Sequence, residues 1–140
     1  MITKIKEIQE RLQRADIRPS VQRMAVMEFL LENRIHPTID MIYNGLSAKI
    51  PTLSKTTVYN TVKTLSDSGV IQTICIDDKN LRYDADIALH AHFKCNICDC
   101  VIDLPVSKVQ VEMQNSENVH ITETHLYYKG FCEKCRTNNK

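Results

Sequence analysis

The sequence of 140 residues lacks several features that would place it in a specialised class of protein. It has no apolar run near the roughly 18 residues that a membrane-spanning helix requires. Its first residues, MITKIKEIQERLQR, are charged and amphipathic, without the apolar core of a signal peptide. With only three glycines and four prolines, it also has no low-complexity linker, and it has no internal repeat. We therefore expect a globular cytoplasmic protein without a membrane partner.

The chain also has little net charge, a formal +1 at pH 7. The balance is uneven, because residues 1–83 carry 12 basic against 9 acidic side chains and residues 84–140 carry 6 against 8. A basic first part is suited to a polyanion, and an acidic second part is suited to cations. The asymmetry is mild, and an ordinary solvated surface has the same balance.

Six cysteines are present, and in a cytoplasmic chain they are more typical of metal ligands than of disulfides. Four of them form two C-x-x-C pairs separated by 33 residues: Cys95, Cys98, Cys132 and Cys135. Four thiolates favour a tetrahedral structural zinc ion (Zn²⁺) with no open coordination position. A redox-active pair and free buried thiols are the alternatives. The other two, Cys75 and Cys100, are expected to be spare thiols.

Histidines and acids form a second group of candidate ligands. His90 and His92 are two positions apart, so on an extended strand both rings lie on one face and can reach the same ion. His36, Asp84 and Asp103 complete a set of three nitrogens and two oxygens, which suits Fe²⁺, Mn²⁺, Co²⁺ or Zn²⁺. An ion bound by all five would act as a switch between two domains. The alternative for His36 is an ordinary cap or surface residue.

Helical periodicity dominates the first half of the chain. It predicts a helix around residues 5–12, a second from the Pro-Ser pair at 19–20 and a third from the Pro-Thr pair at 37–38. Ser54 is suited to cap a fourth helix that ends at Gly69. The β-rich runs VIQTICI and LRYDAD then predict a hairpin. This order of elements is typical of a winged helix-turn-helix.

The second half has shorter elements. Strands are expected at HFKC, CVIDL and VHITETHLYY, and a helix near Ser107–Gln114. The fold class is therefore α+β, with an N-terminal winged helix-turn-helix DNA-binding domain followed by a small α/β domain. We place the first domain at residues 1–83, a hinge at 84–89 and the second, metal-binding domain at 90–140.

The fourth predicted helix is the candidate for contacting DNA. Its exposed face offers side chains that can bond phosphates or base edges: Lys55, Thr57, Tyr59 and Asn60. Arg18 and Arg23 lie outside this helix and could bind phosphates. The alternatives are a solvated, threonine-rich helix and a winged helix that binds another protein.

Together these motifs resemble the ferric uptake regulator (Fur) family of metal-responsive repressors over nearly the whole chain. The segments that carry the resemblance are RPSVQR (18–23), HPTIDMIY (36–43), SKTTVYNTVKTLSDSGV (54–70), RYD (82–84), HAHFKCNIC (90–98), VIDL (101–104) and GFCEKC (130–135). The resemblance implies a homodimer on a palindromic operator in double-stranded DNA, with residues 90–140 as the dimerisation domain. It also implies a structural Zn²⁺ at the four cysteines, a regulatory ion at the hinge, and Tyr59 in contact with bases.

Within that family the chain is most similar to the peroxide-stress regulators (PerR). Their regulatory set resembles His36, Asp84, His90, His92 and Asp103. Position 84 is Asp here, where iron-sensing members usually have Glu. The resemblance implies a regulatory Fe²⁺ or Mn²⁺, and it implies oxidation of His36 or His90 when peroxide meets bound Fe²⁺.

Three positions depart from other branches of the family. Zinc-sensing members tend to have Cys where this chain has Ala85, so that branch is not expected. Many Fur proteins have a further metal site, but its positions beside the two histidines are Leu89 and Ala91 here. We therefore do not expect that site, and we expect His120 and His125 on the surface.

The function expected from these residues is a peroxide-responsive, metal-dependent DNA-binding repressor. It is not expected to be an enzyme, because one histidine is consumed per event and peroxide is a signal rather than a substrate. An iron-availability repressor is the alternative of the same class. A zinc-ribbon protein-interaction module without DNA binding is the alternative from another class.

Overall fold

The computed structural model describes residues 2–77, 79–106, 113 and 116–138. The chain divides into two compact units, residues 1–87 and residues 88–140. The finer division into 1–83, 84–89 and 90–140 stays a prediction. Among the described residues, no helix combines the length and the apolar character needed to cross a membrane.

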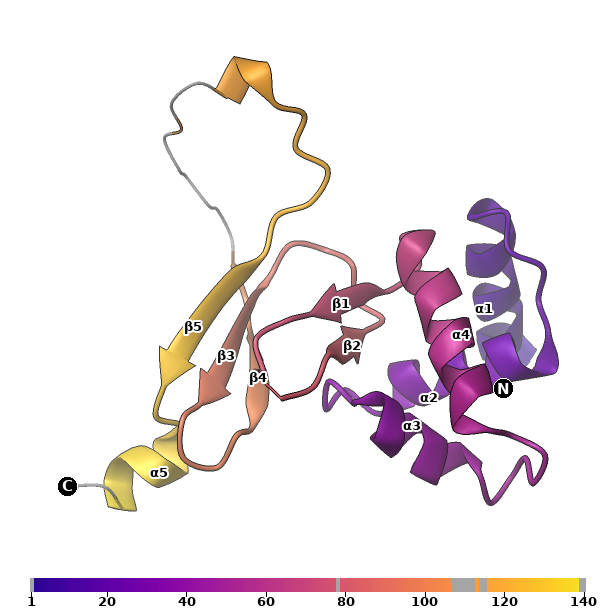
Figure 1. Cartoon of the computed structure of the whole chain (residues 1–140), viewed down its shortest axis with the longest axis horizontal. Coiled ribbons are helices and arrows are strands. Elements are labelled where there is room, and N and C mark those ends of the chain that lie inside the picture. The colour runs from indigo at the N-terminus through magenta and orange to yellow at the C-terminus, as the bar shows by residue number, and fades with distance from the viewer. Residues whose placement is uncertain (1, 78, 107–112, 114–115, 139–140) are drawn as a thin grey trace. The chain divides into compact units, whose positions relative to one another are not determined.

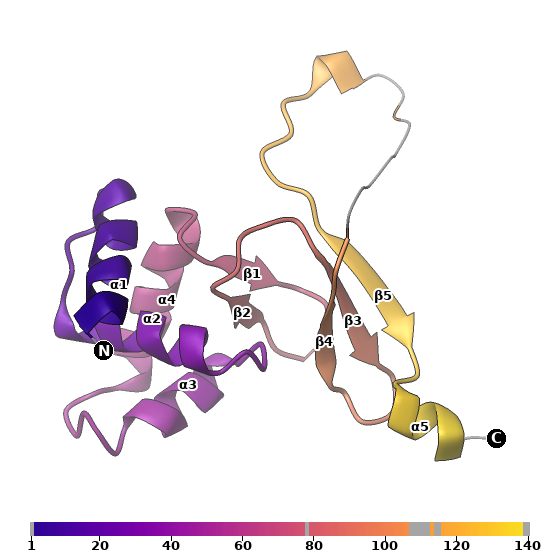
Figure 2. The same ribbon diagram turned by 180° about the vertical axis from the view of Figure 1, so that it is seen from behind.

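The first unit contains four helices followed by a two-stranded hairpin (Figures 1 and 2). In chain order these elements are α1 Ile2–Arg14, α2 Val21–Glu32, α3 Ile39–Leu46, α4 Lys55–Asp67, β1 Gln72–Ile74 and β2 Arg82–Asp84. The strands pair antiparallel, with Thr73 opposite Tyr83. The predicted winged helix-turn-helix order is confirmed, with α3 and α4 as the two helices of the motif and β1–β2 as the wing.

Side-chain caps begin three of the helices where the sequence predicted them. The hydroxyls of Ser20, Thr38 and Ser54 accept hydrogen bonds from the N–H groups three residues later, at 3.2, 3.3 and 3.1 Å. Each cap satisfies a backbone donor that has no partner within its helix. At the end of α4, Gly69 has φ +75° and Val70 N–H donates to the Leu65 carbonyl at 3.0 Å. This is the left-handed glycine stop that was predicted.

All four helices contribute apolar side chains to one core in the first unit. Its most deeply buried members include Ile8, Leu12, Val26, Met27, Leu30, Ile42, Val58, Val62 and Leu65. The inward faces of α2, α3 and α4 follow the predicted helical spacing. Burial of these side chains holds α4 with its opposite face, including the half-exposed Tyr59, turned to solvent.

The second unit is a three-stranded sheet with a C-terminal helix. It contains β3 Ala91–Cys95, β4 Val101–Leu104, a short 3₁₀ helix at Ser116–Asn118, β5 Leu126–Gly130 and α5 Glu133–Asn138. The strand order is β4-β3-β5, with β4 antiparallel and β5 parallel to the central β3. The register places Asp103 on one side of His92 and Tyr127 on the other.

Very little apolar surface is buried within this second unit. Among its described residues, the fully buried apolar side chains are Ala91 and Cys95. Its large exposed apolar side chains are Leu89, Ile97, Ile102, Leu104, Met113, Val119, Ile121, Tyr128 and Phe131. A unit this small with so little core needs another source of stability, such as a metal ion or a second copy of the chain.

Two expectations for this unit require comment. The strand predicted at VHITETHLYY was too long, because regular pairing begins only at Leu126 and residues 119–125 have no strand structure. Alternating residue types there do not create a strand without a partner to bond. The helix predicted near Ser107–Gln114 falls almost entirely outside the described residues.

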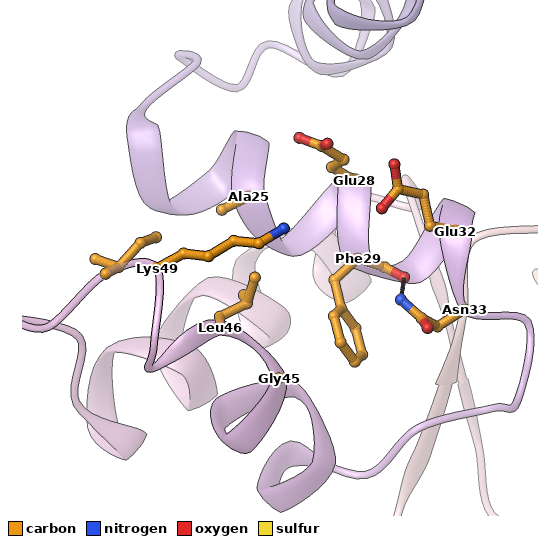
Figure 3. A pocket seen from close by; sticks show the side chains of 9 residues that line it. Ala25, Glu28, Phe29, Glu32, Asn33, Gly45, Leu46 and Lys49 are labelled. Atoms are coloured by element: carbon orange, nitrogen blue, oxygen red, sulfur yellow. Dashed lines mark hydrogen bonds between the residues drawn. The ribbon is translucent and has the colours of Figure 1, made fainter. Parts of the chain in front are cut away.

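A hollow of about 290 Å³ lies between α2 and α3 in the first unit (Figure 3). Ala25, Glu28, Glu32 and Lys49 are among the residues that line it, and the Phe29 ring projects from α2 toward Gly45 on α3. A Cβ atom added at Gly45 would lie 2.9 Å from Phe29 Cζ and closer still to Cε2. Glycine at position 45 is therefore what allows the ring to approach α3.

We predict that Gly45→Ala lowers the free energy of unfolding by roughly 1–3 kcal/mol, because the methyl group overpacks the contact with the ring. In a Phe29→Leu background the shorter side chain leaves room, so the same substitution should be nearly neutral. Urea unfolding followed by the helical circular dichroism signal measures both effects. Equal losses in the two backgrounds would contradict the contact as the cause.

Candidate metal centre and nucleic-acid interface

The two C-x-x-C pairs converge in the second unit. Each of the four cysteines offers its sulfur, and these atoms lie within 4.8 Å of one another: Cys95, Cys98, Cys132 and Cys135. The sulfurs of Cys98 and Cys132 are 3.8 Å apart. A tetrahedral zinc site with Zn–S bonds near 2.3 Å has sulfur–sulfur edges of about 3.8 Å, so the spacing suits this ion.

Backbone N–H groups point at the sulfur atoms of this cluster. Cys95 Sγ accepts from Ile97 N at 3.4 Å and from Cys132 N at 3.5 Å. Hydrogen bonds from backbone N–H groups, first that of Cys132 and then that of Cys98, lower the pKa of the Cys95 thiol to about 6. The pKa of Cys132 is lowered in the same way, mainly by the N–H of Cys135. The backbone therefore favours the thiolate form, which is the species that binds Zn²⁺, at Cys95 and Cys132. The neighbouring Cys132 thiol and burial raise the pKa of Cys135 to about 12, so this cysteine loses its proton when an ion binds.

A fifth thiol, Cys100, lies against this cluster. It is half-buried, and its side chain interacts with those of Cys98 and Cys132. Burial raises the pKa of the Cys100 thiol to about 12, so it is neutral at neutral pH. From the sequence alone we expected Cys100 to be a spare thiol, because residue spacing does not show which side chains face each other across a turn.

The second unit also brings together three of the predicted regulatory ligands. His90 Nε2 and His92 Nε2 lie 3.1 and 3.4 Å from the same oxygen, Asp103 Oδ1. His90 Nδ1 lies 2.7 Å from the Ala88 carbonyl, which can only accept, so this nitrogen carries a proton and Nε2 is the nitrogen that faces Asp103. A backbone carbonyl that orients a histidine in this way is typical of metal ligands.

The first unit holds the other two predicted ligands. His36 Nε2 lies 3.5 Å from Asp84 Oδ2, and both side chains are buried. Asp84 Oδ1 accepts a hydrogen bond from Asp86 N–H at 2.9 Å. Burial excludes the reading of His36 as an ordinary surface residue, and the buried His–Asp pair matches the donor types that borderline divalent ions prefer.

The backbone of His36 is in an uncommon conformation, with φ +56°. Non-glycine residues in this region cost about 1–3 kcal/mol and persist where their surroundings hold them. Arg82 Nη1 donates to the His36 carbonyl at 3.1 Å, and Tyr83 N–H donates to the Pro37 carbonyl at 3.1 Å. Strand β2 of the wing therefore fixes the position of His36.

Arg82 is a residue whose role the sequence did not reveal. Besides its bond to His36, its guanidinium pairs with Asp77 Oδ2 at 3.1 Å from Nη2 and 3.2 Å from Nε. It thus links the β1–β2 loop to a predicted metal ligand. Its position in the RYD segment, which carries the family resemblance, could have marked it as a candidate functional residue. Only the folded structure shows that it donates to the His36 carbonyl.

The candidate DNA-binding side chains occupy different environments within the first unit. Tyr59 and Asn60 are exposed on α4. Lys55 pairs with Asp40 at 3.0 Å, with its Nζ 5.9 Å from the centre of the Tyr43 ring. The Thr57 hydroxyl is 2.9 Å from Ser54 Oγ, so it also supports the helix cap. The DNA contacts of these four residues stay a prediction.

The two candidate arginines lie at the start of α2. Arg18 is exposed, and its backbone carbonyl accepts a hydrogen bond from Arg23 Nη1 at 2.8 Å. Arg23 is thus held against the chain that precedes the helix. Its role as a phosphate contact stays a prediction, as does that of Arg18.

The chain was also compared with models of known protein families. The model described as the ferric uptake regulator family matches residues 14–129. The chain belongs to the ferric uptake regulator family. The resemblance seen in the sequence motifs is therefore confirmed.

Several bacterial regulators are similar to this chain over most of its length. The peroxide-responsive repressor PerR of Staphylococcus epidermidis is 30% identical over 128 residues, which cover 89% of this chain and 85% of that protein. The Helicobacter pylori ferric uptake regulator has the same fold, with a TM-score of 0.71 at 18% identity over 99% of this chain and 95% of that one. Streptococcus pyogenes PerR has a TM-score of 0.54 at 27% identity, over 94% and 92% of the two chains. The PerR proteins have the higher sequence identity to this chain, whereas the Fur protein has the higher TM-score. These values therefore support membership of the family and do not favour one of its branches.

We predict that Cys95→Ser removes most of the bound zinc and lowers the melting temperature, because this residue ends the central strand and its sulfur receives two N–H groups. Zinc per chain, measured by inductively coupled plasma mass spectrometry, checks the first effect, and thermal unfolding checks the second. The matched control is Cys75→Ser, outside the cluster, which should keep the wild-type zinc content. Full zinc retention by Cys95→Ser would contradict the four-thiolate site.

Proposed function

We propose that this Fur-family protein is a metal-dependent transcriptional repressor that binds double-stranded operator DNA as a homodimer and responds to peroxide. The observation that carries the proposal is the presence of two histidine–aspartate groups, in which imidazole nitrogens lie 3.1–3.5 Å from a carboxylate oxygen: His36–Asp84 in one unit and His90–His92–Asp103 in the other. Neither group alone provides a full ligand set for a divalent ion. Pooled, they provide three imidazoles and two carboxylates, a set suited to Fe²⁺ or Mn²⁺.

An ion that needs ligands from both units would make their arrangement depend on metal. With the ion bound, the units are held in one orientation, and two α4 helices in a dimer sit at operator spacing, about one DNA turn apart. When the ion leaves, that restraint is lost and the DNA-bound arrangement is less populated. The Arg82 link from the wing to His36 supports this coupling, because it joins a ligand to an element of the DNA-binding unit.

A homodimer is supported by the exposed apolar surface of the second unit. A sheet with so few buried apolar side chains of its own gains stability by burying surface against a second copy. The family relationship supports the same assembly. A zinc-ribbon interaction module without DNA binding has less support, because the chain also has a capped α4 in a winged helix-turn-helix.

The peroxide branch is supported by Asp84 and by the histidines. Bound Fe²⁺ would supply the electron that reduces peroxide. The residues that hold it would then be the nearest targets, and His36 and His90 match the positions oxidised in the sensors that this chain resembles. Overall, one peroxide oxygen would be added at an imidazole carbon and the other would leave as water. The oxidised ring is a less basic ligand, so the ion would be released. Each event consumes one protein chain, which describes a sensor rather than an enzyme.

The peroxide proposal predicts that the Fe²⁺ form, treated with H₂O₂, gains one oxygen atom on the peptide with His36 or on the peptide with His90, and releases DNA. Tandem mass spectrometry and a gel-shift assay measure the two effects. The Mn²⁺ form is the matched control and should bind DNA without oxidation. An Fe²⁺ form that stays unmodified and bound to DNA would favour the iron-availability repressor instead.

The same proposal predicts that aspartate and glutamate at position 84 give different responses to peroxide. We expect Asp84→Glu to retain metal-dependent DNA binding but to lose most of its peroxide response, because the carboxylate is one methylene further from the backbone and repositions the ion. Retained DNA binding shows that the variant folds. An unchanged oxidation rate would argue that position 84 does not decide the branch.

For DNA contacts, we expect Tyr59→Ala to weaken binding to a palindromic operator duplex more than binding to a scrambled duplex. Arg23→Ala should weaken both equally and reduce the salt slope by about 1, as expected for a phosphate contact. Fluorescence anisotropy over a salt series separates the two patterns. Lys4→Ala, at a residue paired with Glu32 away from α4, is the control and should change neither.

A further inference from the structure

Arg11 on α1 bonds to the chain at both ends of the β1–β2 wing. Its Nη2 lies 2.9 Å from the Val70 carbonyl, just before β1, and 2.7 Å from the Ala85 carbonyl, just after β2. Val70 and Ala85 are buried, and Arg11 is half-buried. A cationic donor makes stronger hydrogen bonds than a neutral one, especially where water is excluded. The contact therefore fastens the segment after β2 to helix α1.

The Ala85 carbonyl belongs to the peptide group that also holds the Asp84 side chain. In the peptide bond between Ala85 and Asp86, the carbonyl accepts from Arg11 Nη2, and the N–H donates to Asp84 Oδ1 at 2.9 Å. This peptide is trans, so the group is planar and its carbonyl and N–H point in opposite directions. The Arg11 guanidinium and the Asp84 carboxylate therefore bond to one rigid group from its two sides.

The two carboxylate oxygens of Asp84 have different partners. Oδ1 accepts the bond from Asp86 N–H, whereas Oδ2 lies 3.5 Å from His36 Nε2. If the peptide group between residues 85 and 86 rotated, its N–H would move and Oδ2 would no longer be held toward His36. The bond from Arg11 opposes that rotation. It therefore helps to fix the oxygen that the predicted regulatory ion would use.

Gln72 on β1 restrains the same segment from another direction. Its Nε2 donates to the Asp86 carbonyl at 2.6 Å. In the register of the wing, Gln72 lies opposite Asp84. The backbone that orients the Asp84 carboxylate is thus held by side chains from both α1 and β1, and only the contact from Arg11 is made by a charged group.

We propose that Arg11 is a positioning residue for the regulatory metal site and acts on Asp84 through the peptide group between Ala85 and Asp86. The inference rests on the proposed function, because it requires Asp84 to be a ligand of the regulatory ion. Groups that orient a metal ligand raise the affinity for the ion without touching it, and their loss typically lowers that affinity about 10-fold or more. Arg11 gives helix α1 a part in metal binding that its core packing alone would not provide.

The test measures Mn²⁺ binding to purified full-length protein that carries its structural zinc. Electron paramagnetic resonance of the free ion gives the dissociation constant. Arg11→Met keeps an apolar stem but removes the donors, and it should raise the dissociation constant about 10-fold. Arg14→Met is the matched control, because Arg14 is an exposed residue of the same helix that lies 3.8 Å from Glu10, and it should bind Mn²⁺ as the wild type does.

Two further variants make the outcome decisive. Asp84→Ala identifies the regulatory site, because the Mn²⁺ bound there should be lost with the carboxylate. Arg11→Gln is a second replacement, polar but too short to reach both carbonyls, and it should weaken binding as Arg11→Met does. The helical circular dichroism signal and the melting temperature without Mn²⁺ report separately on whether each variant is folded.

The possible results separate the proposed function from the role of Arg11. Mn²⁺ binding that Asp84→Ala does not change would refute the regulatory site, and the inference with it. If Asp84→Ala abolishes binding but a folded Arg11→Met or Arg11→Gln protein keeps the wild-type dissociation constant, the role of Arg11 is overturned. A lower melting temperature with unchanged Mn²⁺ affinity would mean that Arg11 only stabilises the fold, and it would overturn the proposal as well.

Discussion

Four sulfur atoms join the turn after β3 to the segment after β5, and the second unit is organised around that junction. The loop closed between Cys98 and Cys132 spans more than half of the unit, so an ion held there removes much of the chain's conformational freedom. Apolar packing offers little in its place, since Ala91 and Cys95 are the buried apolar side chains among the described residues of this unit. The same lack of core leaves apolar surface for a second copy of the chain. Metal binding and the proposed dimer would therefore both compensate for the small apolar core of this unit.

The first unit is stabilised differently, and the difference suits its role. A continuous apolar core and three hydroxyl caps define where its helices begin and which face of α4 remains exposed. This unit can therefore fold without a metal and present a fixed surface. Its connection to metal binding is local, through His36 and Asp84, and the wing residue Arg82 holds the His36 backbone in place. In this arrangement, metal occupancy would change how the units are oriented and not whether the DNA-binding unit is folded.

The helices of the first unit and the thiolate cluster could be predicted from the sequence, because the sequence patterns that indicate them are local or chemically specific. Hydroxyl caps, a glycine stop and helical spacing depend on residues within a few positions of one another, and they predicted α2, α3 and α4 well. Two C-x-x-C pairs identify a thiolate cluster because few other structures require that pattern. The length of β5 was overestimated, because alternation in a sequence does not specify where a partner strand ends. The φ of +56° at His36 was also beyond prediction, because a residue before proline is usually extended.

By itself, the sequence determined the types of donor atom, the order of the elements and the family, since these follow from residue identity and short spacings. Only the tertiary structure decided which backbone N–H groups donate to the Cys95 sulfur, which carbonyl orients His90, and which guanidinium holds His36. These contacts join residues far apart in the chain or across a turn, and their geometry depends on strand register and backbone conformation. For Cys100 the difference is greatest. It is one more cysteine in the sequence, but the hydrogen bond from Cys95 N–H to its carbonyl extends the β3–β4 register and sets it opposite a zinc ligand.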